Sequence, residues 1–137
     1  MKKKIVIISF AFVVVGMLGI FISCSLAKPK QLFHINADDV AQIEVASGST
    51  GNRVYVEDRE DIARIVEEMN NMQYVRKKTF EIMIGWWLRV TLYDKDNNII
   101  TSFLPGGDTE TLEMGRWRYT LVNPSPFDQI FYERYFG

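Results

Sequence analysis

Hydrophobic and polar positions alternate along most of the chain after residue 40, and this pattern predicts a β-rich domain. Two strand-like segments flank the turn-rich stretch SGSTGN, which predicts a hairpin. Short turns containing Asp, Asn or Gly separate the later segments, so we expect them to pair antiparallel. The seven predicted strands are 41–46, 53–57, 73–77, 86–93, 99–104, 109–114 and 116–122.

Two segments carry the signals of a helix instead. In 58–71, apolar residues recur with helical spacing from Ile62 onward, and Asp58 can accept hydrogen bonds from the first turn. In 125–137, Ser125 can play the same capping role before an aromatic stripe. The resulting order is β-β-α-β-β-β-β-β-α. We therefore expect an α+β fold, a mainly antiparallel sheet with two helices packed on one face.

The amino terminus has a different pattern, which predicts a transmembrane or signal helix. Lys2–Lys4 form a basic cap, and residues 5–22 are an 18-residue run without any charged residue. A run of this length is typical of a membrane-spanning helix. The basic cap keeps the amino terminus in the cytoplasm, so the rest of the chain is expected outside the cytoplasmic membrane.

The fate of this segment, 1–27, depends on the residues around Cys24, the only cysteine. The length of the run favours an uncleaved signal anchor, which leaves a single-pass membrane protein. Small residues before Cys24 resemble a bacterial lipobox and indicate lipidation at Cys24, although Phe21 departs from that pattern. Cleavage after Ala27 is the third alternative, because Ser25 and Ala27 make a small-x-small site.

The remaining chain divides into a stalk and one domain. Residues 28–39 contain Pro29 and polar flanking residues, and we interpret them as a short stalk. Residues 40–137 are enough for a single extracytoplasmic domain with one core.

Charge and composition exclude several functions. Three of the sixteen basic residues are Lys2–Lys4, and all seventeen acidic residues follow residue 37, so the rest of the chain has a net charge of −4. Such a domain lacks the basic surface that nucleic acid requires. One histidine, His34, and one cysteine cannot form a multi-ligand metal site of the zinc type, and we expect no metal and no cofactor.

No arrangement of residues indicates catalysis. An acidic cluster occupies the first turn and outer face of the first predicted helix, where the helix dipole and solvent favour it: Glu57, Asp58, Glu60 and Asp61, with Glu67 and Glu68 further along. Asp94, Asp96 and Asn98 match the start of a calcium loop, but Ile99 and Pro105 stand where that loop needs Gly and Glu. His34 lies in the predicted stalk, away from any nucleophile. We therefore do not expect an enzyme.

Aromatic residues provide the candidate binding face. Alternation within 86–93 places Trp86 on the side of the apolar residues and places Trp87, Arg89 and Tyr93 together on the opposite side. Aromatic and arginine side chains on one sheet face are typical of a surface that binds a protein, peptide or glycan. Cross-strand packing uses the same residues, so both interpretations stay open.

The segments FHINADDVAQIEV, EDREDIARIVEEMNNM and LRVTLYDKDNNII, with the aromatic terminal segment, resemble small uncharacterised domains of Gram-positive bacteria. Members of that family, a domain of unknown function, are tethered by one amino-terminal membrane segment or a lipobox. The resemblance implies a Gram-positive cell-surface location and an α+β domain, and it implies no catalytic residue.

These patterns lead to one preferred hypothesis and two alternatives. We expect a non-catalytic, membrane-tethered binding domain at the cell envelope, with its membrane contact through residues 5–22 and a cell-envelope protein, peptide or glycan as partner. One alternative is an immunity or inhibitor protein against a toxin or envelope hydrolase. The other is a small envelope hydrolase.

Overall fold

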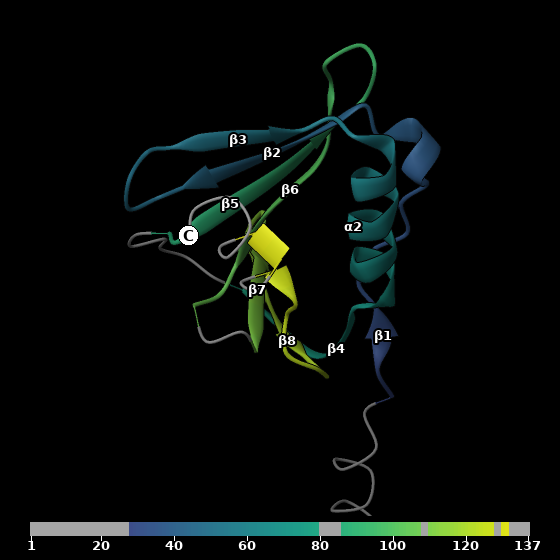
Figure 1. Cartoon of the computed structure of the whole chain (residues 1–137). Helices are drawn as coiled ribbons and strands as arrows, with labels where there is room; N and C mark the ends of the chain where they lie inside the picture. The colour runs from purple at the N-terminus through teal and green to yellow at the C-terminus, as the bar shows by residue number, and fades with distance from the viewer. Residues whose placement is uncertain (1–27, 80–85, 108–109, 128–129, 132–137) are drawn as a thin grey trace, which may run out of the picture.

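The computed structural model describes residues 28–79, 86–107, 110–127 and 130–131 of the chain, and it has an α+β fold (Figure 1). One helix packs against one antiparallel sheet of eight strands, as the sequence predicted for the fold class. The elements in chain order are β1 (Lys30–Gln31), the 3-10 turn η1 (Ala37–Asp39), β2 (Gln42–Ser47), β3 (Arg53–Val56), α2 (Arg59–Asn71), β4 (Gln73–Thr79), β5 (Leu88–Tyr93), β6 (Ile99–Pro105), β7 (Thr111–Met114) and β8 (Trp117–Leu121).

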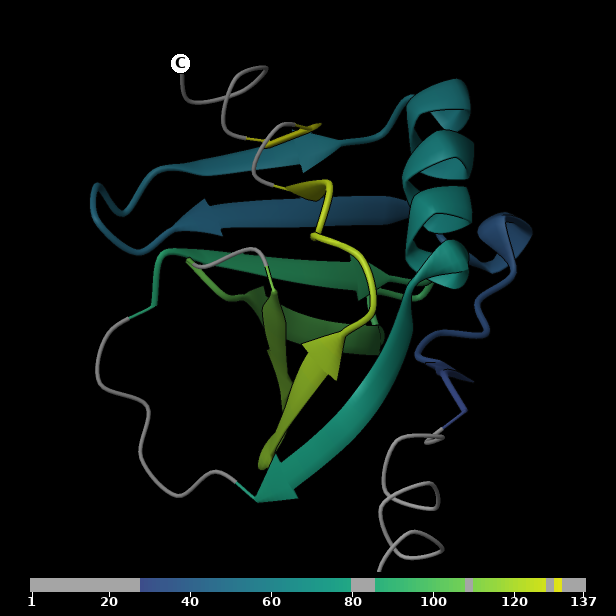
Figure 2. The same cartoon turned by 90° about the horizontal axis from the view of Figure 1, so that it is seen from below.

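The strand order in the sheet is β1-β4-β8-β7-β6-β5-β2-β3. Neighbours in sequence form the β2–β3, β5–β6, β6–β7 and β7–β8 pairs, whereas β2–β5 and β4–β8 join distant segments. Helix α2 carries the chain from β3, at one edge of the sheet, to β4 near the other edge. Figures 1 and 2 show the two halves of the sheet turned strongly relative to one another, with α2 beside both.

Helix α2 begins and ends where the sequence predicted. The Asp58 carboxylate accepts hydrogen bonds from the backbone N–H groups of Glu60 and Asp61, both at 3.0 Å. These two donors have no partner within the helix, so the cap satisfies them. The residues of the predicted apolar stripe are all buried: Ile62, Ile65, Val66 and Met69.

The core lies between this stripe and one face of the sheet. Phe103 and Phe127 are almost completely buried, and their ring centroids are 5.2 Å apart. Burial of such large apolar surfaces is the main favourable term in folding. The sheet contributes Ile43, Val45, Leu88, Val90, Leu92, Leu112, Tyr119 and Leu121 to the same cluster.

The segment predicted as a stalk packs against the domain over most of its length. Lys30 pairs with Tyr74 at the edge of β4, and the Leu32 N–H donates to the Met72 carbonyl at 2.9 Å. Phe33 is only 4% exposed, and its ring centroid lies 5.1 Å from that of Phe103. The pattern around Pro29 signals where helix ends, but it carries no information on this packing.

The second predicted helix is seen only at its start. Ser125 Oγ accepts a hydrogen bond from the Phe127 N–H at 3.3 Å, and the Ile130 N–H donates to the Pro126 carbonyl at 3.0 Å. These contacts form a helical turn, and Phe131 is buried beside it. The rest of the predicted helix lies outside the described residues.

The predicted membrane segment 5–22 and Cys24 also lie outside the part of the chain that the structure describes. Within that part, no helix has the length and apolar character needed to cross a membrane.

Candidate functional site

The face of the sheet opposite the core carries a group of polar side chains at the centre of β2, β5 and β6. Glu44 lies opposite Thr91, and Thr91 lies opposite Ser102, so these three share one row across the strands. In the next row Ala46 separates Arg53 of β3 from Arg89 of β5. Because adjacent strands are about 4.8 Å apart, the two arginines stand on either side of one small residue.

These rows line a hollow of about 350 Å³, which we call the outer hollow. Three features make it a candidate binding site: a buried carboxylate, two guanidinium groups and an indole ring, all on one sheet face. Its lining residues are Glu44, Ala46, Ser47, Gly48, Gly51, Arg53, Trp86, Arg89, Thr91, Tyr93, Ile99 and Ser102.

A buried carboxylate forms the floor of the outer hollow. Glu44 is 7% exposed, and its Oε1 accepts a hydrogen bond from Arg53 Nη1 at 2.9 Å. The Tyr93 hydroxyl donates to the other oxygen, Oε2, at 3.4 Å. Partial desolvation, and then the negative charge of Glu44, raise the pKa of Tyr93 above its usual value of 10.0. Glu44 is therefore a paired structural anion, and its two partners are held at the rim.

A stacked pair forms one wall. The Arg89 guanidinium carbon lies 4.6 Å from the centroid of the Trp86 ring, a cation–π distance. Beside it, the Thr91 and Ser102 hydroxyl oxygens are 3.0 Å apart and hydrogen-bonded. Among the described residues, no hydrogen bond or ion pair engages the Arg89 guanidinium, which is stacked on Trp86, so its N–H groups are available to a ligand.

Gly48 allows the Trp86 backbone to approach the β2–β3 turn closely. A Cβ atom on Gly48 would lie 1.8 Å from the Trp86 carbonyl oxygen, and the Gly48 N–H donates to the Trp87 carbonyl at 2.8 Å. Only glycine fits at this distance. The tight contact holds the backbone of residues 86–87 at the end of the ladder.

The structure brings together two of the three residues predicted for the binding face. Arg89 and Tyr93 line the outer hollow, but Trp87 is 41% exposed and is not among its lining residues. Trp86 takes that place. Alternation from residue 86 predicts Trp86 on the apolar side. However, β5 begins at Leu88, and the residues before it need not alternate.

Sequence reasoning did not identify Arg53, Glu44 or Gly48 as parts of this site. Glu44 was recognisable as a polar position within an alternating strand, but nothing local indicates that its carboxylate is buried. Arg53 and Arg89 come together only through the β2–β5 pairing, which joins segments far apart in the chain.

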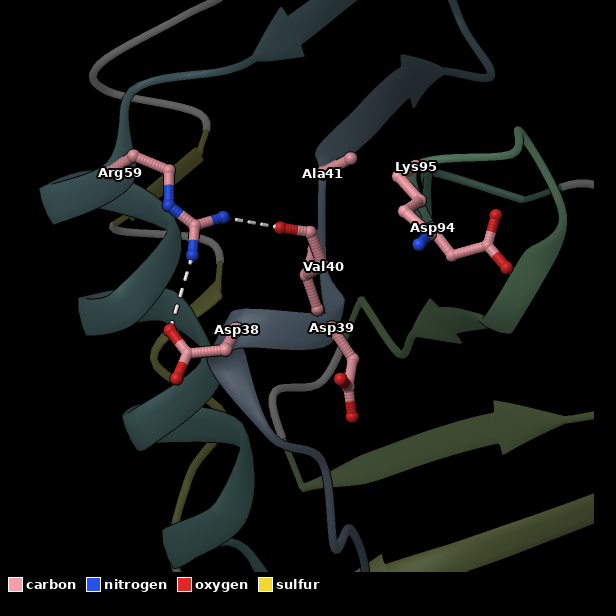
Figure 3. Close-up of a pocket in the computed structure, with 7 residues that line it drawn as sticks. All are labelled: Asp38, Asp39, Val40, Ala41, Arg59, Asp94 and Lys95. Carbon is pink, nitrogen blue, oxygen red and sulfur yellow. Dashed lines mark hydrogen bonds and ion pairs between the residues drawn. The ribbon is translucent and has the colours of Figure 1, made fainter.

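A second, larger hollow of about 660 Å³ lies near the start of α2 (Figure 3). Its one arginine, Arg59, already donates to the Val40 carbonyl at 2.7 Å and to Asp38 at 3.3 Å, so it ties α2 to η1 and β2. Figure 3 shows the Asp39 and Asp94 carboxylates pointing away from this guanidinium. Because its charged groups do not converge, we regard this hollow as structural.

Asp94, the first residue of the calcium-loop comparison, is used by its own turn. Its Oδ1 accepts hydrogen bonds from the N–H groups of Asp96 and Asn98, both at 2.8 Å, and Asn98 Nδ2 donates to Oδ2 at 3.0 Å. Across the described ranges of the chain, no three His, Cys, Asp or Glu side chains are grouped as metal ligands.

Comparison with protein-family models, with curated proteins and with solved structures found no match to this chain.

Proposed function

We propose that this chain is a non-catalytic binding protein that recognises an envelope peptide or glycan through the outer hollow. In this proposal, residues 1–27 tether it to the outer side of the cytoplasmic membrane of a Gram-positive cell. The observation that carries the proposal is the Arg89 guanidinium, stacked on Trp86 beside Thr91 and Ser102 with its N–H groups available. In this proposal, the helical turn at Ser125 continues as the second helix predicted for 125–137.

The chemistry of the hollow favours a ligand that carries a carboxylate. Its charged groups are Arg53, Arg89 and Glu44, which give a net charge of +1. Arg53 is engaged by Glu44, so the charge that a ligand meets is that of Arg89. A guanidinium binds a carboxylate through two parallel hydrogen bonds, and the exposed edge of an indole packs against the apolar part of the same ligand.

The non-catalytic part of the proposal rests on what surrounds the carboxylate. Glu44 is held by Arg53 and Tyr93, so it is not placed to accept a proton from a substrate. Among the described residues that line the hollow there is no histidine or cysteine to activate a nucleophile.

The test is a binding titration with soluble cell-wall fragments that carry peptide carboxylates, using the purified full chain in detergent. We expect saturable binding that Arg89→Ala weakens by about tenfold or more, as loss of a charge-assisted contact does. Arg64→Ala is the matched control, because Arg64 is exposed on α2 and pairs with Asp61 at 2.8 Å. Equal binding by both variants, with unchanged circular dichroism, would overturn the proposal.

The form of the tether is tested separately, by feeding cells an alkyne analogue of palmitate. Label on the wild-type chain that Cys24→Ala removes would establish a lipid anchor at Cys24. Unlabelled protein of full length that remains in the membrane fraction would instead establish the signal anchor, and release of a chain that begins after Ala27 would establish cleavage.

A further inference from the structure

Basic residues gather at the end of the sheet formed by β4, β7 and β8. These three strands and the turn between β7 and β8 carry five basic residues and one acidic residue, Glu113. On the outward face, Arg76, Lys78 and Arg118 lie side by side, because Lys78 is directly opposite Arg118 and Arg76 is opposite Thr120. We call these three residues the basic strip.

The other end of the molecule is acidic. The turn η1 contributes Asp38 and Asp39, and four acidic residues against one arginine, Arg59, surround the start of α2: Glu57, Asp58, Glu60 and Asp61. Figures 1 and 2 both show β1, β4 and β8 at the end of the molecule away from the start of α2. A domain whose net charge is negative therefore concentrates positive charge at one end.

Contacts within the sheet account for only part of the basic strip. Like charges directly opposite one another across two strands are destabilising, and Lys78 and Arg118 are such a pair. Arg118 forms an ion pair with Glu113, since its Nε donates to Glu113 Oε1 at 2.7 Å and its Nη2 donates to the same oxygen. Basic residues on a sheet edge also prevent edge-to-edge aggregation, which accounts for those of β4. Arg118 lies on β8, between β4 and β7, where no edge needs protection.

The tether places this end of the sheet next to the membrane. β1 pairs with β4 through Lys30 and Gln31, so the chain leaves the domain along the flank of β4. If residues 5–22 span the bilayer, seven residues, 23–29, separate the membrane from Lys30. Seven residues extend at most about 25 Å. Lys28 and Lys30, both exposed, add positive charge to this connection.

We propose that the basic strip rests on the anionic headgroups of the membrane that anchors the chain, so that the domain is held in one orientation with its acidic end directed away. The inference rests on the membrane tether of the proposed function, but not on the outer hollow. Basic residues within a Debye length of an anionic leaflet are attracted to it, and this attraction weakens as salt is added. Lipid phosphates thereby meet the charges of Arg76 and Lys78, which share this face of the sheet with the Arg118–Glu113 ion pair.

The experiment uses the full chain in lipid nanodiscs that carry a gadolinium-chelating lipid, with residue-by-residue broadening of amide NMR signals as the readout. With phosphatidylglycerol in the disc, we expect broadening of β4, β8 and the β7–β8 turn to exceed that of α2 and the β5–β6 turn by about twofold or more. With phosphatidylcholine alone, or at high salt, this difference should disappear.

Two variants with the same loss of charge make the test specific. Arg76→Gln with Lys78→Gln should abolish the difference, whereas Arg64→Gln with Lys95→Gln, which removes two basic residues elsewhere, should leave it intact. Uniform broadening in phosphatidylglycerol discs, or equal behaviour of the two variants, would overturn the inference. Soluble polyphosphate provides one further comparison. If it changes the amide NMR signals of the basic strip while the discs cause no lipid-dependent broadening, the inference would also be overturned, and the strip would be assigned to an anionic polymer.

Failure of the tether would be seen first, because the chain would then elute apart from the nanodiscs during gel filtration. That result would overturn both the proposed tether and the orientation. A chain that elutes with the discs but shows no lipid-dependent difference would overturn the orientation alone.

Discussion

Asp94 shows how one carboxylate can organise a turn. It accepts hydrogen bonds from two backbone N–H groups and from the Asn98 side chain, and Asn97 takes a positive φ of 60° between them. The hydrogen bonds from Asn98, side chain first, hold the pKa of Asp94 below its usual value of 3.8. The resemblance to a calcium loop in the sequence thus reflects a turn that satisfies its own donors.

We expect Asn98→Ala to raise the pKa of Asp94, because the side-chain donor is lost while the backbone donors remain. A carboxyl group with a depressed pKa in the folded state stabilises the protein above its unfolded pKa. This contribution to stability is lost as the pH falls through the pKa of the carboxyl group in the folded state. The variant should therefore be less stable than the wild type near neutral pH and equal to it in strong acid. Carboxyl NMR titration and urea unfolding at both pH values measure this, with Asn52→Ala, an exposed amide between β2 and β3, as the control.

Glu44 should act on Tyr93 in the opposite direction. Its negative charge disfavours the tyrosinate, so Glu44→Gln is expected to lower the pKa of Tyr93 toward its usual value, with the part caused by desolvation remaining. Tyrosine labelled with ¹³C at Cζ permits the titration, and Tyr93→Phe assigns the signal. An unchanged titration would contradict the hydrogen bond between the two side chains.

At the scale of elements, Gly48 connects the β2–β3 turn to the start of β5. We expect Gly48→Ala to displace the Trp86 backbone, because its Cβ would overlap the Trp86 carbonyl oxygen. Overpacking of this kind typically costs about 1–3 kcal/mol, and ligand binding at the outer hollow should weaken with it. Gly107→Ala is the matched control, since no heavy atom lies within 4 Å of its Cβ.

The measurements are the free energy of unfolding in urea and the change in Trp86 environment by near-ultraviolet circular dichroism. For Gly48→Ala we expect both the free energy of unfolding and the near-ultraviolet spectrum to change. For Gly107→Ala the free energy of unfolding should stay within about 0.5 kcal/mol of the wild type, and the spectrum should not change. A Gly48→Ala variant with wild-type stability and binding would contradict this prediction. It would show that the β2–β3 turn can move aside and does not fix the position of Trp86.

The elements differ in how well the sequence predicts them, and the difference follows from the range of the signals. Helix α2 was predicted because its cap and its stripe lie within fourteen consecutive residues, 58–71. The hairpins were predicted because each turn is local. The β2–β5 and β4–β8 pairs depend on packing across the whole domain, and no local pattern encodes them.

The candidate site was predicted in part for the same reason. Strand alternation is a local rule. It predicts Arg89 and Tyr93 on one face, and both residues line the outer hollow. Trp86 and Trp87 precede β5, where the contact with Gly48 decides the backbone path and the alternation rule does not apply. The Arg53–Glu44 pair is local to one hairpin, but its burial requires β5 and β6 beside it.

At the scale of the whole molecule, the packing of residues 30–39 limits how far the domain could stand from the proposed anchor. The Asn70 side chain accepts a hydrogen bond from the Ile35 N–H at 2.9 Å and donates to the Ile35 carbonyl at 2.7 Å. Together with β1 and Phe33, these contacts fasten the segment to α2 and β4. If residues 5–22 form the proposed membrane segment, the connection to it is therefore shorter than a stalk of 28–39 would be.

Phe33 should be the residue on which this attachment depends most. We expect Phe33→Ala to lower the free energy of unfolding by about 3–5 kcal/mol, the usual cost of removing a buried phenylalanine ring. His34→Ala is the matched control, because His34 is the exposed neighbour on the same segment, and its effect should stay within about 0.5 kcal/mol.

Denaturation of the full chain in a mild detergent, together with amide hydrogen exchange, distinguishes two consequences of that substitution. If residues 30–39 belong to the cooperative unit, Phe33→Ala lowers protection of β4 and α2 along with its own segment. If the segment were a stalk that merely lies on the surface, exchange would accelerate in residues 30–39 alone, and the unfolding midpoint would match that of His34→Ala. In that case the domain could lift away from the membrane by the full length of the segment, and the orientation proposed for the basic strip would have no mechanical support.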